Sequence, residues 1–139
     1  MKLLKLLSVT LLAGAVLLAI AILPSRLCFK DAESYAFFTG DTSKNFSEVT
    51  TDSGADAVRL TVGKLSGECA YYKSLDLDGL LKSVNGEIVF VEEYEGSVNY
   101  YCKADLPYSV NLYGEEINLH VCFRPDGVKV ASPIIFGGY

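Results

Sequence analysis

The chain has 139 residues, of which 50% are hydrophobic, and a formal net charge of −5. This length leaves room for one domain. The acidic balance predicts no nucleic-acid partner, because a negatively charged surface repels phosphate backbones.

The first two dozen residues are strongly apolar. Lys2 and Lys5 form a short basic start, and residues 6–23 then continue without a charge. Such a run is at the lower limit of what spans a bilayer, and it exceeds the usual core of a cleaved signal. We therefore predict that residues 1–23 form an uncleaved signal anchor. A cleaved signal peptide, with a small-x-small site at residues 19–21, and a buried soluble helix are the alternatives.

The two lysines also predict the orientation of the chain, because basic residues tend to stay in the cytoplasm. Residues 24–33 then form a juxtamembrane linker, and residues 34–139 form an extracytoplasmic domain. This predicts a single-pass protein of the cell membrane, or a secreted protein if the signal is cleaved. Without the two lysines, 10 basic residues stand against 17 acidic ones, a balance of −7.

The sequence contains four cysteines, at positions 28, 69, 102 and 122. An even count in an exported protein permits disulfides, with three possible pairings. Buried free thiols are at least as consistent with the apolar, strand-like surroundings of the last three. The pairing therefore stays open, and the spacings match no zinc site.

The first half of the domain carries weak local signals. Residues 35–38 are typical of a strand, residues 40–43 of a turn, and residues 46–50 of a second strand. Residues 52–63 fit either a helical turn or an alternating strand, and both interpretations stay open.

The clearest helix is predicted over residues 76–85. Its apolar residues recur at helical spacing on one stripe: Leu77, Leu80, Leu81 and Val84. Ser74 or Asp76 is suited to cap its start, and Asn85-Gly86 supplies a left-handed stop.

The period then changes from helix to strand. Residues 87–94 are apolar on both faces, as in the centre of a sheet, and Glu95-Gly96 turns the chain back into residues 97–103. Tyr113-Gly114 joins residues 108–112 to residues 116–123 in a hairpin, and residues 125–127 form the strongest turn. Residues 128–131 then pair back.

The sum of these elements is an α+β fold. We expect an antiparallel sheet of about five or more strands, with one main helix packed on one face and an N-terminal hydrophobic helix before it. At the end of the chain, Pro133 marks a bend, residues 134–136 bury against the sheet or helix, and residues 137–139 finish the edge.

No catalytic residue, cofactor or metal is predicted. His120 is the sole histidine and points to the same side of its strand as Cys122, but strand neighbours two apart lie roughly 7 Å from each other. We interpret His120 as a polar residue on the less buried sheet face. The carboxylates fit helix-dipole and edge-protecting roles: Asp76 and Asp78 at a helix start, and Glu92, Glu93 and Glu95 beside a hairpin turn.

Tyrosine is unusually common, with nine residues and no tryptophan. Two pairs are adjacent, so one ring of each pair faces each side of the sheet. Rings on the face without the helix form a possible interaction surface, and half-buried sheet tyrosines are the alternative. The candidate residues for this surface are Tyr71, Tyr72, Tyr100, Tyr101 and His120.

Residues 117–139 resemble the closing segment of the YwmB-like proteins. The matching positions are Asn118, Leu119, Arg124, Val128, Val130, Ser132, Pro133, Ile134 and Tyr139. Residues 34–43 and 100–110 also look like shorter members of that family. The resemblance implies a bacterial exported or membrane-tethered protein with one half of a TATA-box-binding-protein-like fold. It implies no catalytic residues and no established activity, and fold alone does not fix function.

Three functions remain open at this stage. The leading hypothesis is a non-enzymatic, membrane-anchored interaction or structural module of the bacterial cell envelope, with an unknown protein or envelope partner. The second is an envelope enzyme or enzyme accessory that uses His120, Cys122 and the acidic residues. The third is self-association through an open sheet edge.

Overall fold

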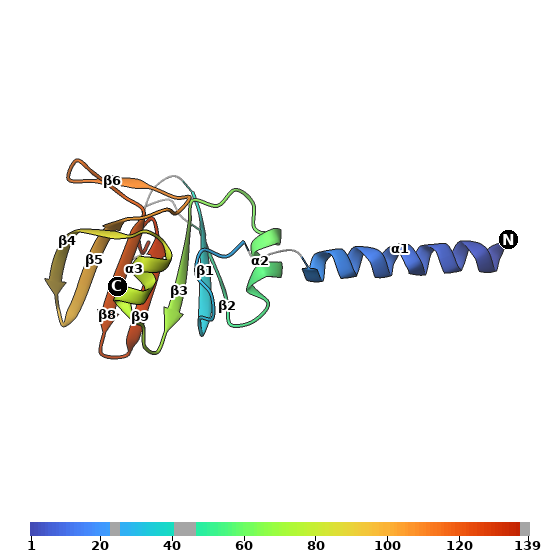
Figure 1. Cartoon of the computed structure of the whole chain (residues 1–139), viewed down its shortest axis with the longest axis horizontal. Coiled ribbons are helices and arrows are strands. Elements are labelled where there is room, and N and C mark those ends of the chain that lie inside the picture. The colour runs from blue at the N-terminus through green and yellow to red at the C-terminus, as the bar shows by residue number, and fades with distance from the viewer. Residues whose placement is uncertain (23–25, 41–46, 137–139) are drawn as a thin grey trace.

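The computed structural model describes residues 1–22, 26–40 and 47–136, and Figure 1 shows a long helix followed by a sheet domain. The helices are α1 (Lys2–Ile22), α2 (Ala55–Thr61) and α3 (Leu77–Ser83). The strands are β1 (Ser34–Thr39), β2 (Ser47–Thr51), β3 (Gly67–Tyr72), β4 (Glu87–Tyr94), β5 (Ser97–Lys103), β6 (Val110–Leu112), β7 (Glu115–Ile117), β8 (Leu119–Arg124) and β9 (Gly127–Ser132). The predicted α+β class is confirmed.

Among the described residues, the main sheet has seven strands in the order β2-β1-β3-β9-β8-β5-β4, and every neighbouring pair is antiparallel. It is larger than the minimum of five strands that the sequence predicted. The strands β6 and β7 form a separate two-stranded hairpin. The last strand, β9, lies between β3 and β8, so residues 127–132 lie in the middle of the sheet.

The helix α3 packs on one face of the sheet, as predicted (Figure 1). We call this the helix face. Its core comes from β3, β5, β8 and β9, which contribute Ala70, Cys102, Leu119, Val121, Val128 and Val130. The predicted stop is also present, because Asn85 has a positive φ of 50° and the N–H of Gly86 donates to the carbonyl of Leu81 at 2.7 Å.

The opposite face, which we call the tail face, is covered in part by residues 133–136. Ile135 is buried against Cys69, Cys122 and Ala131, and the ring of Phe136 meets Phe38 edge-on at 5.0 Å. The predicted burial of residues 134–136 is confirmed for Ile135, and Ile134 and Phe136 are half-buried. The face on which we expected an interaction surface is therefore covered where this segment lies. The predicted role of residues 137–139 falls outside the described residues.

The placement of residues 87–94 in the centre of the sheet is wrong. Within the described part of the chain, β4 is an edge strand, paired with β5 on one side alone. Its apolar residues on both faces stay partly open to solvent, with Val91 48% exposed on the helix face and Tyr94 60% exposed on the other face. A strand with apolar residues on both faces is suited to burial, but this pattern does not indicate whether the strand has one neighbouring strand or two.

The three weak local signals in the first half of the domain have different outcomes. Residues 55–61 of the ambiguous segment are helical, as α2, and Ala55 is its buried residue. The predicted turn at residues 40–43 falls mostly outside the described residues. The strand predicted at residues 46–50 is present as β2.

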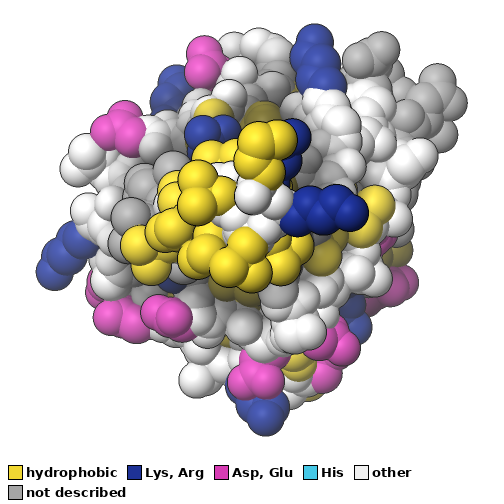
Figure 2. All heavy atoms as spheres, turned by 90° about the vertical axis from the view of Figure 1, so that its right-hand side faces the viewer, with side chains coloured by type: hydrophobic (Ala, Val, Ile, Leu, Met, Phe, Trp, Pro, Cys, Tyr) yellow, Lys and Arg dark blue, Asp and Glu magenta, His cyan; other side chains and the backbone are white. Residues whose placement is uncertain are grey.

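The helix α1 extends away from the sheet domain, and its described side chains are exposed (Figure 1). Residues 2–19 are apolar enough and long enough to cross a membrane, and they lie close to the N-terminus. Viewed along its axis in Figure 2, the helix shows apolar side chains around most of its circumference. A membrane span and a signal sequence both have this character.

We expect Gly127→Ala to lower the free energy of unfolding by about 2–3 kcal/mol, measured by denaturant titration. Gly127 has a φ of 150°, and an added Cβ would lie 2.5 Å from the Tyr71 hydroxyl and 2.7 Å from the backbone carbonyl oxygen of Tyr72. Gly114 is the matched control, because its φ is 84° but nothing lies within 4 Å of the added Cβ. Equal losses for the two alanine variants would contradict steric crowding at Gly127.

Candidate functional site

The tail face carries a buried polar network centred on His120, which is 1% exposed. The backbone N–H of Ile135 donates to Nδ1 of His120 at 3.2 Å, and Nε2 lies 2.9 Å from Oδ1 of Asn99. Because Nδ1 accepts, Nε2 carries the proton and donates to Asn99. Asn99 then donates to Oγ of Ser97 at 3.2 Å, and Ser97 donates to the Tyr94 carbonyl at 2.6 Å.

This network holds His120 as a neutral imidazole. Both ring nitrogens have partners within the protein, and burial lowers the pKa of His120 from 6.5 to about 3. The expectation that His120 lies on a less buried face is therefore wrong. Residues 133–136 and the β6–β7 hairpin fold over this part of the sheet, which the alternation of strand residues does not reveal.

A row of stacked rings runs from His120 to the edge of the sheet. Tyr101 stacks on His120 with ring centroids 4.4 Å apart, and Phe90 stacks on Tyr101 at 4.6 Å. Tyr113, at the tip of the β6–β7 hairpin, meets Phe90 edge-on at 5.8 Å and is 86% exposed. We call these four rings the ring ladder. It connects the buried network to solvent at β4.

A cavity of about 180 Å³ lies beside the ring ladder. Its lining combines aromatic, aliphatic and acidic side chains: Glu92, Tyr101, Leu112, Tyr113, His120, Ile134 and Ile135. Aromatic faces with one carboxylate favour a cationic group over an anionic one. The cavity is therefore a candidate site for a cationic group on the tail face.

The structure separates the five residues of the predicted interaction surface. Tyr101 and His120 stack on the tail face, and Tyr71 lies on the same face on β3. Tyr72 and Tyr100 lie on the helix face and pack against its core. Each adjacent pair therefore places one ring on each side of the sheet, as predicted. Their role in binding stays a prediction.

The four thiols are free and poorly suited to nucleophilic chemistry. Burial raises the pKa of the Cys69 thiol to about 12 and of the Cys102 thiol to about 11, and it raises the pKa of Cys122 as well. Cys122 shares the tail face with His120, as the sequence predicted. Both nitrogens of His120 are already engaged, so His120 is not available as a general base for this buried thiol.

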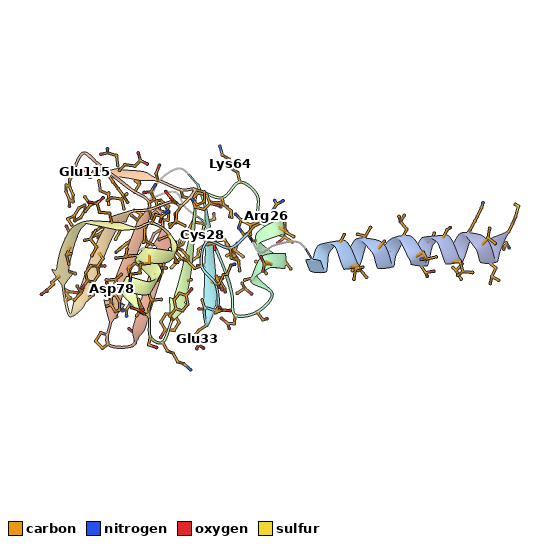
Figure 3. All side chains as sticks on the ribbon, in the orientation of Figure 1. Arg26, Cys28, Glu33, Lys64, Asp78 and Glu115 are labelled. Atoms are coloured by element: carbon orange, nitrogen blue, oxygen red, sulfur yellow. The ribbon has the colours of Figure 1, made fainter. Side chains whose placement is uncertain are left out.

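Among the described residues, no group of three or more His, Cys, Asp or Glu side chains is placed to hold a metal ion. Of the acidic candidates, Glu92 lines the cavity, whereas Glu93 pairs with Val98 and so lies on the other side of β4. Asp76 and Asp78 belong to the start of α3, and Asp78 is labelled in Figure 3.

The sequence interpretation missed a second buried ionisable group, Glu68 on the helix face. Its side chain is 0% exposed and lies 3.5 Å from Nε of Arg59 on α2. It also accepts the backbone N–H of Cys28 at 2.8 Å, and Figure 3 places Cys28 near the start of the domain. Burial raises the pKa of Glu68, opposed by the Cys28 N–H and Arg59. The sequence did contain one signal for this buried carboxylate: Glu68 alternates with Ala70 and Tyr72, so it lies on the same face of the strand as these two core residues.

Arg59 extends this cluster to a third segment, because its guanidinium donates to the Tyr108 hydroxyl at 3.4 Å. Next to the cluster, Ser132 at the end of β9 donates to the backbone carbonyl of Tyr108 at 3.3 Å. The cluster joins the segment after α1 to α2 and the sheet, which is a structural role.

No family model, curated protein or solved structure matches this chain.

Acid should destabilise the domain through His120. The pKa of His120 is near 3 in the folded chain, against 6.5 for an unperturbed histidine, so the unfolded state binds the proton more tightly. The stabilisation is present above pH 6.5 and is lost as the pH falls toward 3. Denaturant titrations across this window should show a steeper loss for the parent than for His120→Gln, which does not titrate. If the parent and His120→Gln lost stability equally as the pH falls, His120 would not be the cause of the acid destabilisation.

Proposed function

We propose that the chain is a membrane-anchored, extracytoplasmic protein whose sheet domain is a non-enzymatic interaction or structural module of the bacterial cell envelope. The observation that carries this proposal is α1, a helix of 21 residues whose described side chains are exposed. At 1.5 Å per residue it is about 32 Å long, close to the ~30 Å hydrocarbon core of a bilayer.

The polar groups of α1 support a bilayer environment. The Ser8 hydroxyl donates to the Lys5 carbonyl at 2.9 Å, and the Thr10 hydroxyl donates to the Leu6 carbonyl at 3.0 Å. These hydroxyls are therefore satisfied within the helix, as lipid requires. Lys2 and Lys5 lie at the end away from the domain (Figure 1), which favours a cytoplasmic N-terminus.

The non-enzymatic part of the proposal is supported by the tail face. The engaged nitrogens of His120 and the raised pKa values of the buried thiols disfavour the enzyme alternative. The resemblance to YwmB-like proteins stays part of the proposal, and the α+β architecture with its closing β8–β9 hairpin is compatible with it.

Membrane anchoring is tested with a reporter enzyme that folds only outside the cytoplasm, fused after Tyr139 and expressed in bacteria. We expect reporter activity, retention of the full-length chain in the membrane fraction, and resistance to alkaline extraction. A Leu12→Arg variant should be released from the membrane, because a charge in the middle of a span is unfavourable, whereas Leu12→Ala should be retained. An inactive reporter, or a shortened secreted product, would contradict the anchored form.

The interaction role is tested by photo-cross-linking in the same cells, with the reactive group placed on exposed positions of the sheet domain. The expected result is a reproducible adduct with another envelope component. Adducts with the chain itself alone would contradict a module that binds a different partner.

A further inference from the structure

Within the described residues, the edge strand β4 has an unpaired side, and it is unusually acidic. It carries Glu87, Glu92 and Glu93, with Glu95 in the following turn, and it contains no basic residue. Its apolar side chains are exposed as well, with Val91 48% and Tyr94 60% accessible. An exposed edge with apolar side chains is a template for another strand.

The register shows which backbone groups are available to a partner. Glu95 and Gly96 have φ values of 46° and 81°, as in a two-residue hairpin turn, so the flanking pair Tyr94 and Ser97 exchanges both hydrogen bonds. Since bonded and non-bonded pairs alternate, Glu92 also bonds to β5. The N–H and C=O groups of Val91 and Glu93 therefore face away from β5, at the open edge.

The negative charge of the β4 edge favours a positively charged partner strand. A second copy of β4 in antiparallel pairing would bring two strands with several glutamates each into contact, which is unfavourable. A strand rich in lysine or arginine would place its charges among the same glutamates and gain from them. Charge complementarity therefore favours a basic extended peptide over self-association.

The cavity beside the ring ladder offers a place for one basic side chain. The side chains of Phe90 and Glu92 lie on the tail face, and Glu92 and Tyr113 both line the cavity there. A lysine or arginine on the tail-face side of an added strand would meet the carboxylate of Glu92 and the exposed ring of Tyr113. Ion pairing and cation–π attraction would then act on the same group.

We propose that the β4 edge binds a basic, extended protein segment by strand addition, with one cationic side chain at Glu92 and Tyr113. This inference names the partner class for the interaction module and rests on the proposed function. The backbone of Val91 and Glu93 supplies the pairing, and the glutamates supply the preference for basic sequence.

The test uses the full chain in a non-denaturing detergent and a fluorescent peptide as long as β4 with alternating lysine and valine. Anisotropy should report binding that weakens as salt is raised. Val91→Pro should reduce the affinity about tenfold or more, because proline removes an outward N–H without removing a bond to β5. Val91→Thr, which keeps the N–H, is the matched control and should bind like the parent.

Two further variants separate charge and ring contributions. Glu92→Gln combined with Glu93→Gln should weaken binding about tenfold. Tyr113→Asn should weaken it less, and it keeps the turn intact because asparagine is favoured at this position of a two-residue hairpin. If Val91→Pro fails to fold, the same peptide with methylated backbone nitrogens on alternate residues, which cannot pair along its edge, should bind about tenfold more weakly than the unmodified peptide.

Equal binding of the methylated peptide would overturn strand addition, and equal binding of an alternating glutamate–valine peptide would overturn the preference for basic sequence. A dimer through β4, seen by sedimentation of the full chain and lost in Val91→Pro, would also overturn the assignment of the partner. Envelope adducts that persist unchanged in cells with Val91→Pro would refute the β4 edge as the binding site, while the proposed interaction function would still hold. Peptide binding without any envelope adduct would refute the interaction function instead.

Discussion

Truncation after Ser132, which removes residues 133–139, should lower the free energy of unfolding by about 4 kcal/mol or more. Loss of the Ile135 and Phe136 side chains removes apolar contacts with Phe38, Cys69 and Cys122. Burial of a large apolar side chain contributes about 1.5–3 kcal/mol. The truncation also removes the backbone N–H that donates to Nδ1 of His120, and a hydrogen bond of this kind contributes about 0.5–1.5 kcal/mol.

The effect is measured by denaturant unfolding of the full-length and truncated chains in detergent. A chain that ends at Phe136 is the control that separates residues 133–136 from the last three. Ile135→Ala keeps the backbone N–H and should lower the free energy of unfolding by about 2–4 kcal/mol. Ile134→Ala should lower it less, because Ile134 is only half-buried. A truncated domain as stable as the parent would mean that residues 133–136 are not part of the folded unit.

The truncation also makes a prediction about pH that simple loss of apolar contact does not. Without residues 133–136, solvent reaches His120, and its pKa should return toward 6.5. The folded and unfolded states then bind the proton similarly, so the acid destabilisation between pH 6.5 and 3 should become smaller than in the parent. An unchanged acid profile would show that burial by this segment is not the cause of the low pKa.

The sequence predicted those parts of the structure that depend on neighbours in the chain. The helix stop at Asn85-Gly86, the Tyr113-Gly114 hairpin and the β8–β9 turn each follow from residues a few positions apart. The same holds for the two faces of each strand, because alternation assigns side chains to a face. Alternation does not say which strands are neighbours, so the position of β4 at the edge was not predicted.

The candidate site was harder to predict for the same reason. The network at His120 joins β5, β8 and residue 135, and the partners of Glu68 come from positions 28 and 59. Such contacts arise when distant segments meet, and a single sequence contains no local pattern for them. His120 looked like a half-exposed residue because its cover, residues 133–136, has no strand or helix period.

Arg59→Ala should lower the free energy of unfolding by about 3 kcal/mol at neutral pH, because it leaves the buried carboxylate of Glu68 without its cation. Arg59 is 19% exposed at its side chain and Glu68 is 0% exposed, so the remaining charge is poorly reached by solvent. Denaturant titration of the variant measures the loss. Arg59→Lys keeps a cation but loses the hydrogen bond to Tyr108, so its free energy of unfolding should lie between those of the parent and Arg59→Ala.

The pH dependence identifies the orphaned charge as the cause. Burial already raises the pKa of Glu68, and removal of Arg59 raises it further. A carboxyl with a raised pKa binds its proton more tightly in the folded state, so its contribution to stability is present in acid and lost as the pH rises. The deficit of Arg59→Ala relative to the parent should therefore shrink in mild acid and grow toward neutral pH.

A second substitution tests the same cause at constant pH. Glu68→Gln removes the charge but keeps an oxygen that accepts the Cys28 N–H. In the Arg59→Ala background it should restore part of the lost stability, whereas in the parent it should be destabilising, since it leaves Arg59 without its anion. This opposite sign is the signature of coupling between two residues. Additive losses would instead mean that Arg59 stabilises the domain through packing of its alkyl chain alone.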